Sequence, residues 1–441
     1  GSDNIDHRLR HSDFAADGHR HGAPWLGMAV EQINQLDRLL LVGSFLRKDH
    51  PLIAARVRAA VKRGCQVSVV HASDEDLLMP VAAKAIVAPA AWTHALAEIA
   101  AAVAQIKGVS APVAGSTPGE DARRIAASLA SGERAAVLLG NAAVQSPQAA
   151  QIQALAQWIA QTTGARFGVL GEGANSVGAY AVDARPIQGG LNARTMLEQR
   201  RRAYLLWNFE PEYDTANPAL TLGALSAADT VIAFSAYRNG ALEYADAILP
   251  IAPFLETSGT FVNCEGRVQT FNGAVRPFGE SRPGWKVLRV LGTQLGIPGF
   301  EFDTPEAVRA ALPPIGADRL DGRIDLAPQA PAAVPAGALQ RLADVPVYFT
   351  DPIVRRAESL QMTADARPPK LAANGATLSQ LGLKPGDKAR AKQWVDGKEA
   401  AALLEVALDE RVADGTVRVA AGHAATSTLG AMFGAISVER A

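Results

Sequence analysis

Short runs of consecutive apolar residues alternate with longer stretches that repeat apolar positions at helical spacing. The run at 38–42 is followed by a stripe on Ile53, Val57 and Ala60, and a second apolar run covers 66–70. Uninterrupted apolar strands are typical of parallel sheets covered by helices on both faces. The pattern therefore predicts a strand–helix–strand unit, with Pro51 in the first helical turn.

The same alternation continues to about residue 296. It predicts strands at 38–42, 66–70, 135–139, 166–170, 203–207, 230–234 and 247–249, and helices at 51–61, 92–106, 118–131, 147–163, 194–201, 220–228 and 284–296. The sequence strand–loop–helix–strand occurs twice, at 38–70 and at 203–234. Such a pseudo-repeat indicates two Rossmann-like halves rather than a short-period solenoid.

The stretch 247–271 has a different pattern. Pro250 ends the apolar strand, and β-forming residues at 260–263 and 268–271 flank a turn in which Gly266 supplies positive φ. Polar residues are dense along its approach. The stretch predicts a hairpin whose polar groups either satisfy one another or form a cradle for a ligand.

Beyond residue 310 the helical periodicity stops. Residues 311–346 are rich in Pro, Ala and Gly, which predicts a linker. The remainder, 347–441, is β-rich, with strands predicted at 378–383, 388–394, 402–408 and 416–420 and a turn at 384–387.

Composition limits the functional classes. The 441 residues are 48% apolar and 20% charged, which is ordinary for a globular protein with two to four domains. A net charge of −1 gives no electrostatic case for nucleic acid or an anionic membrane, and no apolar run reaches spanning length. Cys65 and Cys264 are too few for an iron–sulfur cluster or a cysteine zinc site, and fit a reducing compartment.

A family resemblance rests on several of these motifs. Leu249-Pro, Glu256, Gly259-Thr-Phe, Asn263 and Glu265-Gly-Arg-Val-Gln resemble the signature of the molybdopterin oxidoreductase superfamily. Segments 256–263, 276–289, 43–51 and 173–179 most resemble one branch, the large iron–sulfur (G) subunit of bacterial NADH:quinone oxidoreductase, complex I. Segments 381–390 and 409–423 look like the family's dinucleotide-binding barrel.

The resemblance implies an α/β fold with Rossmann-like doubly wound domains of the formate dehydrogenase/DMSO reductase-like type and a C-terminal double-psi β-barrel. The expected organisation is an α/β region at 1–310, with halves at about 38–190 and 191–310, a linker at 311–346 and the barrel at 347–441. The first residues fit the family register, so the chain is expected to begin inside a larger protein.

The two loops that hold nucleotide in the family depart from its pattern here. Gly43 and His50-Pro51 match, but Phe45-Leu46 replaces Asn-Pro, and Trp207-Asn-Phe-Glu replaces Gly-Glu-Asn-Pro. Bulky side chains would occupy space that a nucleotide needs, which predicts a vestigial cleft. Its candidate residues are Gly43, Ser44, His50, Asn175, Asn208, Glu256, Gly259, Thr260, Asn263 and Arg267.

The sequence offers three further candidate sites, and each of them also has a purely structural explanation. The His-rich segment 1–37 could hold a metal but lacks completing carboxylates or cysteines. The loop 171–178 is a poor dinucleotide fingerprint and equally a tight strand exit. Glu256 and Glu265 have no accompanying nucleophile or metal ligand, so no catalytic or metal-binding residue is predicted.

The favoured hypothesis is a structural, cofactor-less part of the complex I G subunit, with no molybdopterin expected. Iron–sulfur clusters would lie only in a missing upstream region, which relays electrons from NADH towards quinone. The expected partners are the other subunits of the peripheral arm, on the cytoplasmic side of the inner membrane. Two alternatives stay open: a formate dehydrogenase-like molybdopterin oxidoreductase fragment, and a pterin- or nucleotide-binding module without turnover.

Overall fold

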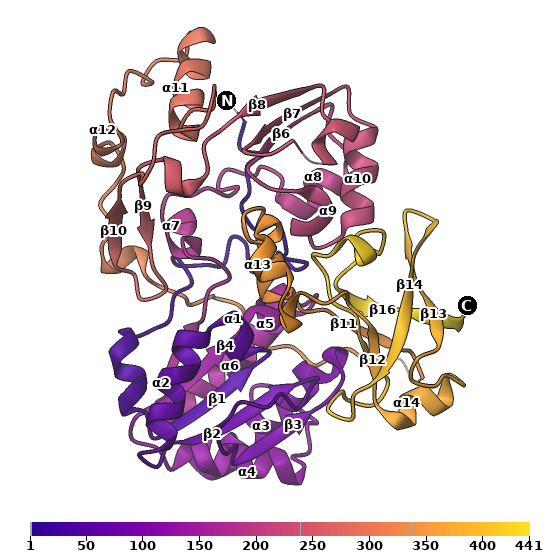
Figure 1. The fold of residues 1–441 in the computed structure, drawn as a ribbon. Coiled ribbons are helices and arrows are strands. Elements are labelled where there is room, and N and C mark those ends of the chain that lie inside the picture. The colour runs from indigo at the N-terminus through magenta and orange to yellow at the C-terminus, as the bar shows by residue number, and fades with distance from the viewer. Residues whose placement is uncertain (1, 239, 335–336) are drawn as a thin grey trace.

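A parallel sheet forms the centre of the first third of the chain (Figure 1). The computed structural model describes residues 2–238, 240–334 and 337–441. Within them, five strands pair in the order β3-β2-β1-β4-β5, all parallel. Their bounds are β1 (Arg38–Val42), β2 (Gln66–His71), β3 (Ala83–Ile86), β4 (Ala135–Leu139) and β5 (Arg166–Val169). The predicted apolar runs are therefore strands; only β3 escaped the pattern.

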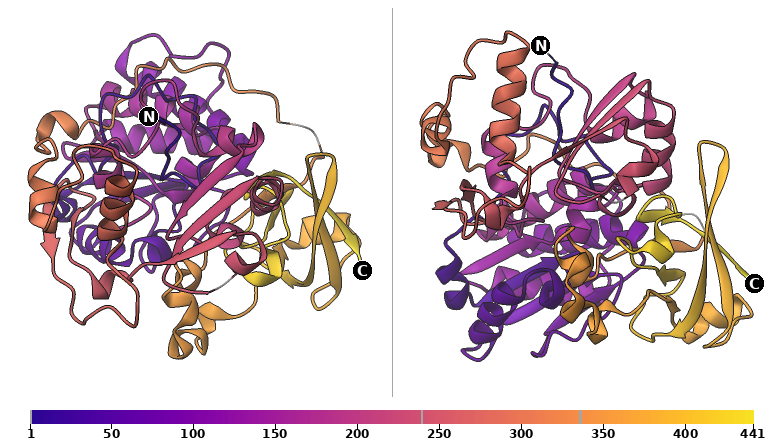
Figure 2. Two further views of the ribbon diagram at one scale, coloured as in Figure 1. Left: turned by 90° about the horizontal axis from the view of Figure 1, so that it is seen from above. Right: turned by 45° about the horizontal axis from the view of Figure 1, so that its top comes forward.

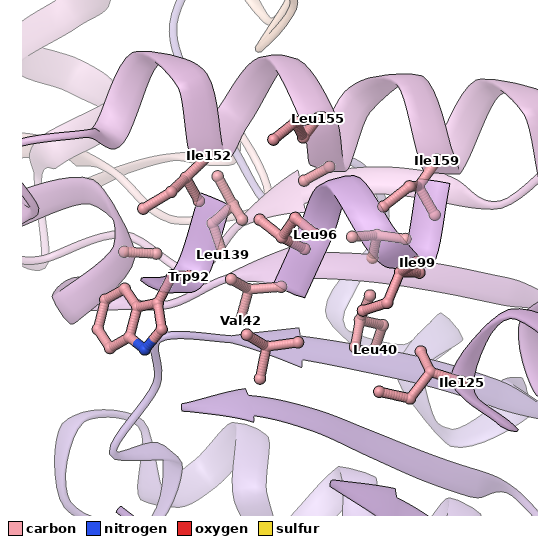
Figure 3. Close-up of a cluster of buried hydrophobic side chains, with 14 of the residues drawn as sticks. Leu40, Val42, Trp92, Leu96, Ile99, Ile125, Leu139, Ile152, Leu155 and Ile159 are labelled. Carbon is pink, nitrogen blue, oxygen red and sulfur yellow. The ribbon is translucent and has the colours of Figure 1, made fainter. Parts of the chain in front are cut away.

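Both faces of this sheet are buried against helices. Leu40 and Val42 belong to one core cluster, whereas Leu39 and Leu41 belong to the other, as the two-residue period of a strand requires. Figure 3 shows the first cluster, where helix side chains meet the sheet. The helices of the first cluster are α3 (Trp92–Lys107), α4 (Glu120–Ala130) and α6 (Ala149–Thr163); α1 (Leu46–Asp49), α2 (Pro51–Val61) and the 3₁₀ helix η1 (Val30–Gln35) serve the second.

A second parallel sheet, β6-β7-β8, follows in the middle of the chain. Its strands are β6 (Ala203–Trp207), β7 (Thr230–Ser235) and β8 (Ala247–Pro250). Tyr204 and Leu206 point into a small core that includes residues of α8 and α10, while Leu205 and Trp207 are exposed. The helices near this sheet are α8 (Ala193–Glu198), α9 (Pro211–Asp214) and α10 (Pro218–Ser226). Earlier in the chain, α5 (Asn141–Gln145) packs on α6 beside the first sheet, and α7 (Ser176–Ala181) contacts β9.

The predicted hairpin is present. β9 (Gly259–Val262) and β10 (Val268–Phe271) pair antiparallel, and Gly266 has φ +84° in the turn. α11 (Gly284–Gln294) and α12 (Pro305–Ala310) follow at the periphery (Figures 1 and 2). Further 3₁₀ helices are η2 (Pro89–Ala91), η3 (Gly240–Glu243), η4 (Phe254–Glu256), η5 (Ala317–Arg319), η6 (Val347–Phe349), η7 (Val354–Arg356), η8 (Ala364–Ala366) and η9 (Ala424–Thr426).

The C-terminal part forms a curled, mixed sheet. Among the described residues its order is β16-β11-β15-β12-β14-β13-β17. The bounds are β11 (Gln340–Leu342), β12 (Leu371–Ala373), β13 (Lys388–Val395), β14 (Lys398–Leu408), β15 (Thr416–Arg418), β16 (Phe433–Ala435) and β17 (Ser437–Arg440), with helices α13 (Glu358–Gln361) and α14 (Gly375–Gln380). This sheet lies beside the first one (Figure 1).

Two predictions need correction here. The linker predicted at 311–346 contains β11, which pairs with β15 and β16, because Gln340–Leu342 is buried despite its Pro- and Ala-rich surroundings. The strand predicted at 378–383 is instead α14 and its exit, because the Asn374 side chain caps a helix by accepting from Thr377 N at 2.8 Å. In the described parts of the chain, no helix combines the length and apolarity that crossing a membrane requires.

Candidate functional site

The loops that leave β1 and β4 touch at the carboxyl edge of the first sheet. The Gly43 carbonyl accepts from Ala143 N at 3.2 Å, and the Val42 carbonyl accepts from Gly140 N at 2.9 Å. A Cβ on Gly43 would lie 2.5 Å from Ala143 N, and Gly43 has φ +57°. Only glycine fits there, so the predicted importance of Gly43 has a steric cause. This edge is where doubly wound sheets bind ligands.

Three buried polar atoms at this edge have no hydrogen-bond partner among the described residues: Ser44 Oγ, His50 Nδ1 and Asn141 Oδ1. His50 Nε2 lies 2.6 Å from the Gly171 carbonyl, to which it can only donate, so Nδ1 carries the lone pair. Burial lowers the pKa of His50, although the Gly171 carbonyl acts in the opposite direction. The edge therefore presents a hydroxyl and two acceptors that are available to a ligand or water.

His71, at the end of β2, also has an unpartnered ring nitrogen. Its Nδ1 accepts from Ser73 N at 3.0 Å, and Nε2 has no partner among the described residues. The ring stacks on Trp92, with centroids 5.8 Å apart, and meets the Phe45 ring edge-on at 4.6 Å. Burial lowers the pKa of His71 to about 4, so the ring is neutral near pH 7.

Phe45 and the C-terminal sheet close this edge. Phe45 is only 3% exposed, and the Arg418 guanidinium lies 4.8 Å from its ring centroid. Arg418 is bound to Glu75 at 2.8 Å and to Asp344 at 2.7 Å. Burial, reinforced by the nearby Asp344 carboxylate, raises the pKa of Asp49 to about 7. Phe45 therefore fills the space between His71 and Arg418 at this edge.

The loop after β6 lies at the second sheet, apart from the edge that holds Gly43, Ser44 and His50. Asn208 has φ +54° and its N–H donates to the Phe234 carbonyl at 2.8 Å, while Trp207 packs on Phe234 with centroids 4.8 Å apart. Beyond it lies a buried ionic cluster that the sequence did not reveal. Glu210 is bound by Arg355 at 2.7 Å and Arg356 at 2.5 Å, and Asp214 by Arg355 and by Arg10 at 2.8 Å.

The polar groups of the hairpin mostly satisfy one another. Asn263 Oδ1 accepts from the N–H groups of Glu265 and Arg267, at 3.2 and 2.9 Å, and Arg267 is also paired with Glu265 at 3.2 Å. The Asn175 side chain accepts from Val262 N at 2.8 Å. The simpler of the two predictions, an internally satisfied network, therefore describes the turn.

The remaining candidates are backbone or surface residues. Glu256 accepts from Phe278 N at 2.9 Å, Thr260 pairs with Thr270 across the hairpin, and Gly259 lies under the Phe271 ring. The ten predicted residues thus form no single site. Gly43, Ser44 and His50 meet at the first sheet, Asn208 lies by the second, and the others surround the hairpin.

Small cavities flank the first edge. One of about 40 Å³ is lined by residues that include Arg20, Ser176 and Tyr180, and one of about 10 Å³ by residues that include Ser44 and His71. In the wall of the larger one, Glu172 accepts from His11 at 2.5 Å and from Gln145 at 2.7 Å. Burial alone would raise the pKa of Glu172, but the His11 charge and these hydrogen bonds outweigh it and lower the pKa to about 2.

Comparison with known proteins identifies the kind of fold. A family model described as molybdopterin oxidoreductase matches residues 1–294. Among solved structures, acetylene hydratase from Pelobacter acetylenicus superposes with a TM-score of 0.63 at 14% identity, covering 93% of this chain and 81% of that one. The α/β fold predicted for this class, with doubly wound parallel sheets and a curled C-terminal sheet, is confirmed.

Curated relatives match over shorter segments. A candidate formate dehydrogenase of Staphylococcus haemolyticus is 28% identical over 120 residues, or 26% of this chain and 12% of that protein. One of Staphylococcus aureus strain USA300 is 38% identical over 86 residues, 18% of this chain and 9% of that protein. The matched segments thus span only about a tenth of these relatives.

The expectation that this fragment holds no cofactor, and in particular no molybdopterin, is wrong. The family model, described as molybdopterin oxidoreductase, points to a molybdopterin-type cofactor. The donor set at the first edge fits the polar parts of such a group, because Ser44, His50 and Asn141 each have a buried atom without a partner among the described residues. The two cavities of about 40 and 10 Å³ are smaller than the roughly 300 Å³ that an organic ligand needs. In this conformation neither cavity has room for a pterin.

Proposed function

We propose, from the premise that this chain belongs to the molybdopterin oxidoreductase family, that it is a section of a larger oxidoreductase of the formate dehydrogenase-like kind. The observation that carries the proposal is the group of unpartnered polar atoms on Ser44, His50 and Asn141, at the sheet edge where this class of fold binds ligands. These residues would hold the polar edges of a molybdopterin-type cofactor.

The residues present indicate which steps the chain would perform and which the cofactor would perform. Redox chemistry would be supplied by the cofactor, whereas the chain binds it, orients it and excludes water. His50 is held in one tautomer by Gly171, so it offers an acceptor and no charge. Arg418 and the C-terminal sheet cover the edge, so entry of the cofactor requires the Phe45 loop and this cover to separate.

The test is cofactor content of the intact protein isolated from its native host. Molybdenum by mass spectrometry and pterin by fluorescence after release are expected at about one per chain. The double variant Ser44→Ala/Asn141→Ala is expected to lose most of both, since two polar contacts are worth about 1–3 kcal/mol each when buried. Ser128→Ala, a change to a hydroxyl outside this edge, is the matched control. Protein without either molybdenum or pterin would contradict the proposal.

A second candidate, the large iron–sulfur subunit of complex I, is favoured by one observation. Phe45, which replaces the family's nucleotide-contacting residue, is buried between His71 and Arg418. In that case the chain would be a structural part of the peripheral arm, among other subunits on the cytoplasmic side of the membrane. Copurification of the native protein with NADH-oxidising and quinone-side subunits would support this candidate, and their absence at low salt would reject it.

A further inference from the structure

The sheet β6-β7-β8 has one apolar face that the described chain covers only in part, because Phe234 is 1% exposed and Gly284 lies against Trp207. Leu205 is 59% exposed, Trp207 39% and Leu249 37%, although their neighbours Tyr204 and Leu206 are buried under α8 and α10. Parallel sheets are almost always covered on both faces. Exposed apolar side chains gathered on one face of a sheet favour an interaction site.

This face continues into the segment 272–295. The backbone of Arg282 extends β8, because its carbonyl accepts from Ala252 N at 2.8 Å. Gly284, the first residue of α11, lies so close to Trp207 that a Cβ would be 2.7 Å from the indole ring. Phe278 is 86% exposed and Leu295 65%. Figures 1 and 2 show α11 standing out from the body of the molecule beside this sheet.

The surface is also basic, although the whole chain has a net charge of −1. Residues 267–289 contain five arginines and lysines and a single carboxylate, Glu280. Arg276, Arg282 and Lys286 are exposed, and within the described residues none of them makes an ion pair. Unpaired cations around an apolar centre favour a partner that brings carboxylates, since complementary charge guides association and excludes other surfaces.

We infer that Leu205, Trp207, Leu249 and Phe278, with their rim of Arg276, Arg282 and Lys286, form a docking surface for an acidic amphipathic helix of a partner protein. The three strands pair in parallel, and apolar faces of parallel sheets are the surfaces on which helices pack in doubly wound folds. The carboxylates flanking the apolar stripe of that helix meet the cationic rim. This surface is independent of what the first sheet edge binds.

The test places a photo-reactive benzoylphenylalanine at position 205 of the full-length protein in its native host. The expected adduct is a protein segment rich in Asp and Glu with apolar residues at helical spacing, identified by mass spectrometry. The triple variant Arg276→Glu/Arg282→Glu/Lys286→Glu is expected to reduce the yield at least about fivefold, since three favourable charge contacts become repulsive. Thermal unfolding establishes that the variant is folded.

The matched control has the same probe at Leu52, which is 81% exposed on α2, together with Arg58→Glu on the same helix. No acidic helical segment is expected there, nor any effect of the charge change. Absence of an adduct at position 205, an adduct with lipid or with the protein's own peptides, or a yield unchanged by charge reversal would each overturn the inference. So would charge-dependent binding of the purified protein to vesicles of anionic phospholipid that the triple variant loses.

Discussion

Arg341 is a cation buried in the C-terminal sheet, and none of the described carboxylates forms an ion pair with it. It is 1% exposed, and its guanidinium donates to the carbonyls of Val419, Ala420, Gly430 and Ala431 and to Gln393 Oε1 at 3.0 to 3.4 Å. Burial lowers its pKa to about 9, with Asp344 acting in the opposite direction. One side chain therefore joins segments that lie 52 to 90 residues away along the chain.

Arg341→Leu is expected to destabilise the protein by about 3–5 kcal/mol, because several buried carbonyls lose their donor together. Urea unfolding followed by circular dichroism measures the loss. Arg202→Leu is the control, since its side chain is 92% exposed and its pair with Asp229 is worth under about 1 kcal/mol. A loss under about 1 kcal/mol for Arg341→Leu would show that water replaces the guanidinium.

Glu172 gives a pH dependence whose sign follows from its lowered pKa. With a folded pKa of about 2 against an ordinary value of 4.5 for glutamate, its ionised form stabilises the fold above pH 4.5, and this stabilisation is lost as the pH falls towards 2. Glu172→Gln is expected to remove on the order of 2 kcal/mol at pH 6 and roughly a quarter of that at pH 2.5, where folded Glu172 is still partly ionised. Urea unfolding at both pH values checks this; equal losses would contradict it. Glu120→Gln, on the exposed first turn of α4, is the control.

At the element scale, the turn after β1 depends on one glycine. Gly43→Ala is expected to cost about 3 kcal/mol or more, because its Cβ meets Ala143 backbone and φ is positive. Gly108→Ala is the matched control: φ is +66° but nothing lies within 4 Å, so about 1 kcal/mol is expected. Thermal unfolding of the two variants compares them, and equal costs would show that the β1 and β4 loops can separate freely.

Elements were predictable where local pattern determined them. β1, β2, β6 and β7 follow from apolar runs, and the hairpin turn from Gly266. β11 could not be predicted, because three residues in a Pro-rich stretch show no hydrophobic periodicity. They form a strand only by pairing with β15 and β16, near residues 416 and 434. α14 did have a signal: Asn374 three residues before Thr377 is a helix cap, and Leu378–Leu383 alone resembles a strand.

The site was predictable to a similar degree. Gly43, Ser44 and His50 lie where a strand of a doubly wound sheet ends, which sequence can locate. Asn141 follows β4 in the same way and was overlooked. Arg418 was beyond sequence reasoning, because its partner Glu75 is 343 residues away and only the packing of the C-terminal sheet brings them together.

For the whole molecule, Arg418 is the charged link between the first sheet and the C-terminal sheet. Arg418→Met keeps the length of the side chain but leaves Glu75 and Asp344 without their cation, beside the buried Asp49. We expect a loss of about 3–5 kcal/mol at pH 8, because unpaired buried carboxylates repel one another.

The loss caused by Arg418→Met should shrink at pH 5. Without the cation the pKa values of these carboxyls rise, so protonation relieves their repulsion as the pH falls. Urea unfolding at the two pH values measures the difference, and faster proteolysis within 311–334 would report separation of the two sheets. Arg411→Met, whose side chain is 48% exposed and paired locally with Asp409, should cost under about 1 kcal/mol. A deficit for Arg418→Met that is equal at pH 5 and pH 8 would mean that Arg418 holds the sheets together by packing on Phe45 rather than by its charge.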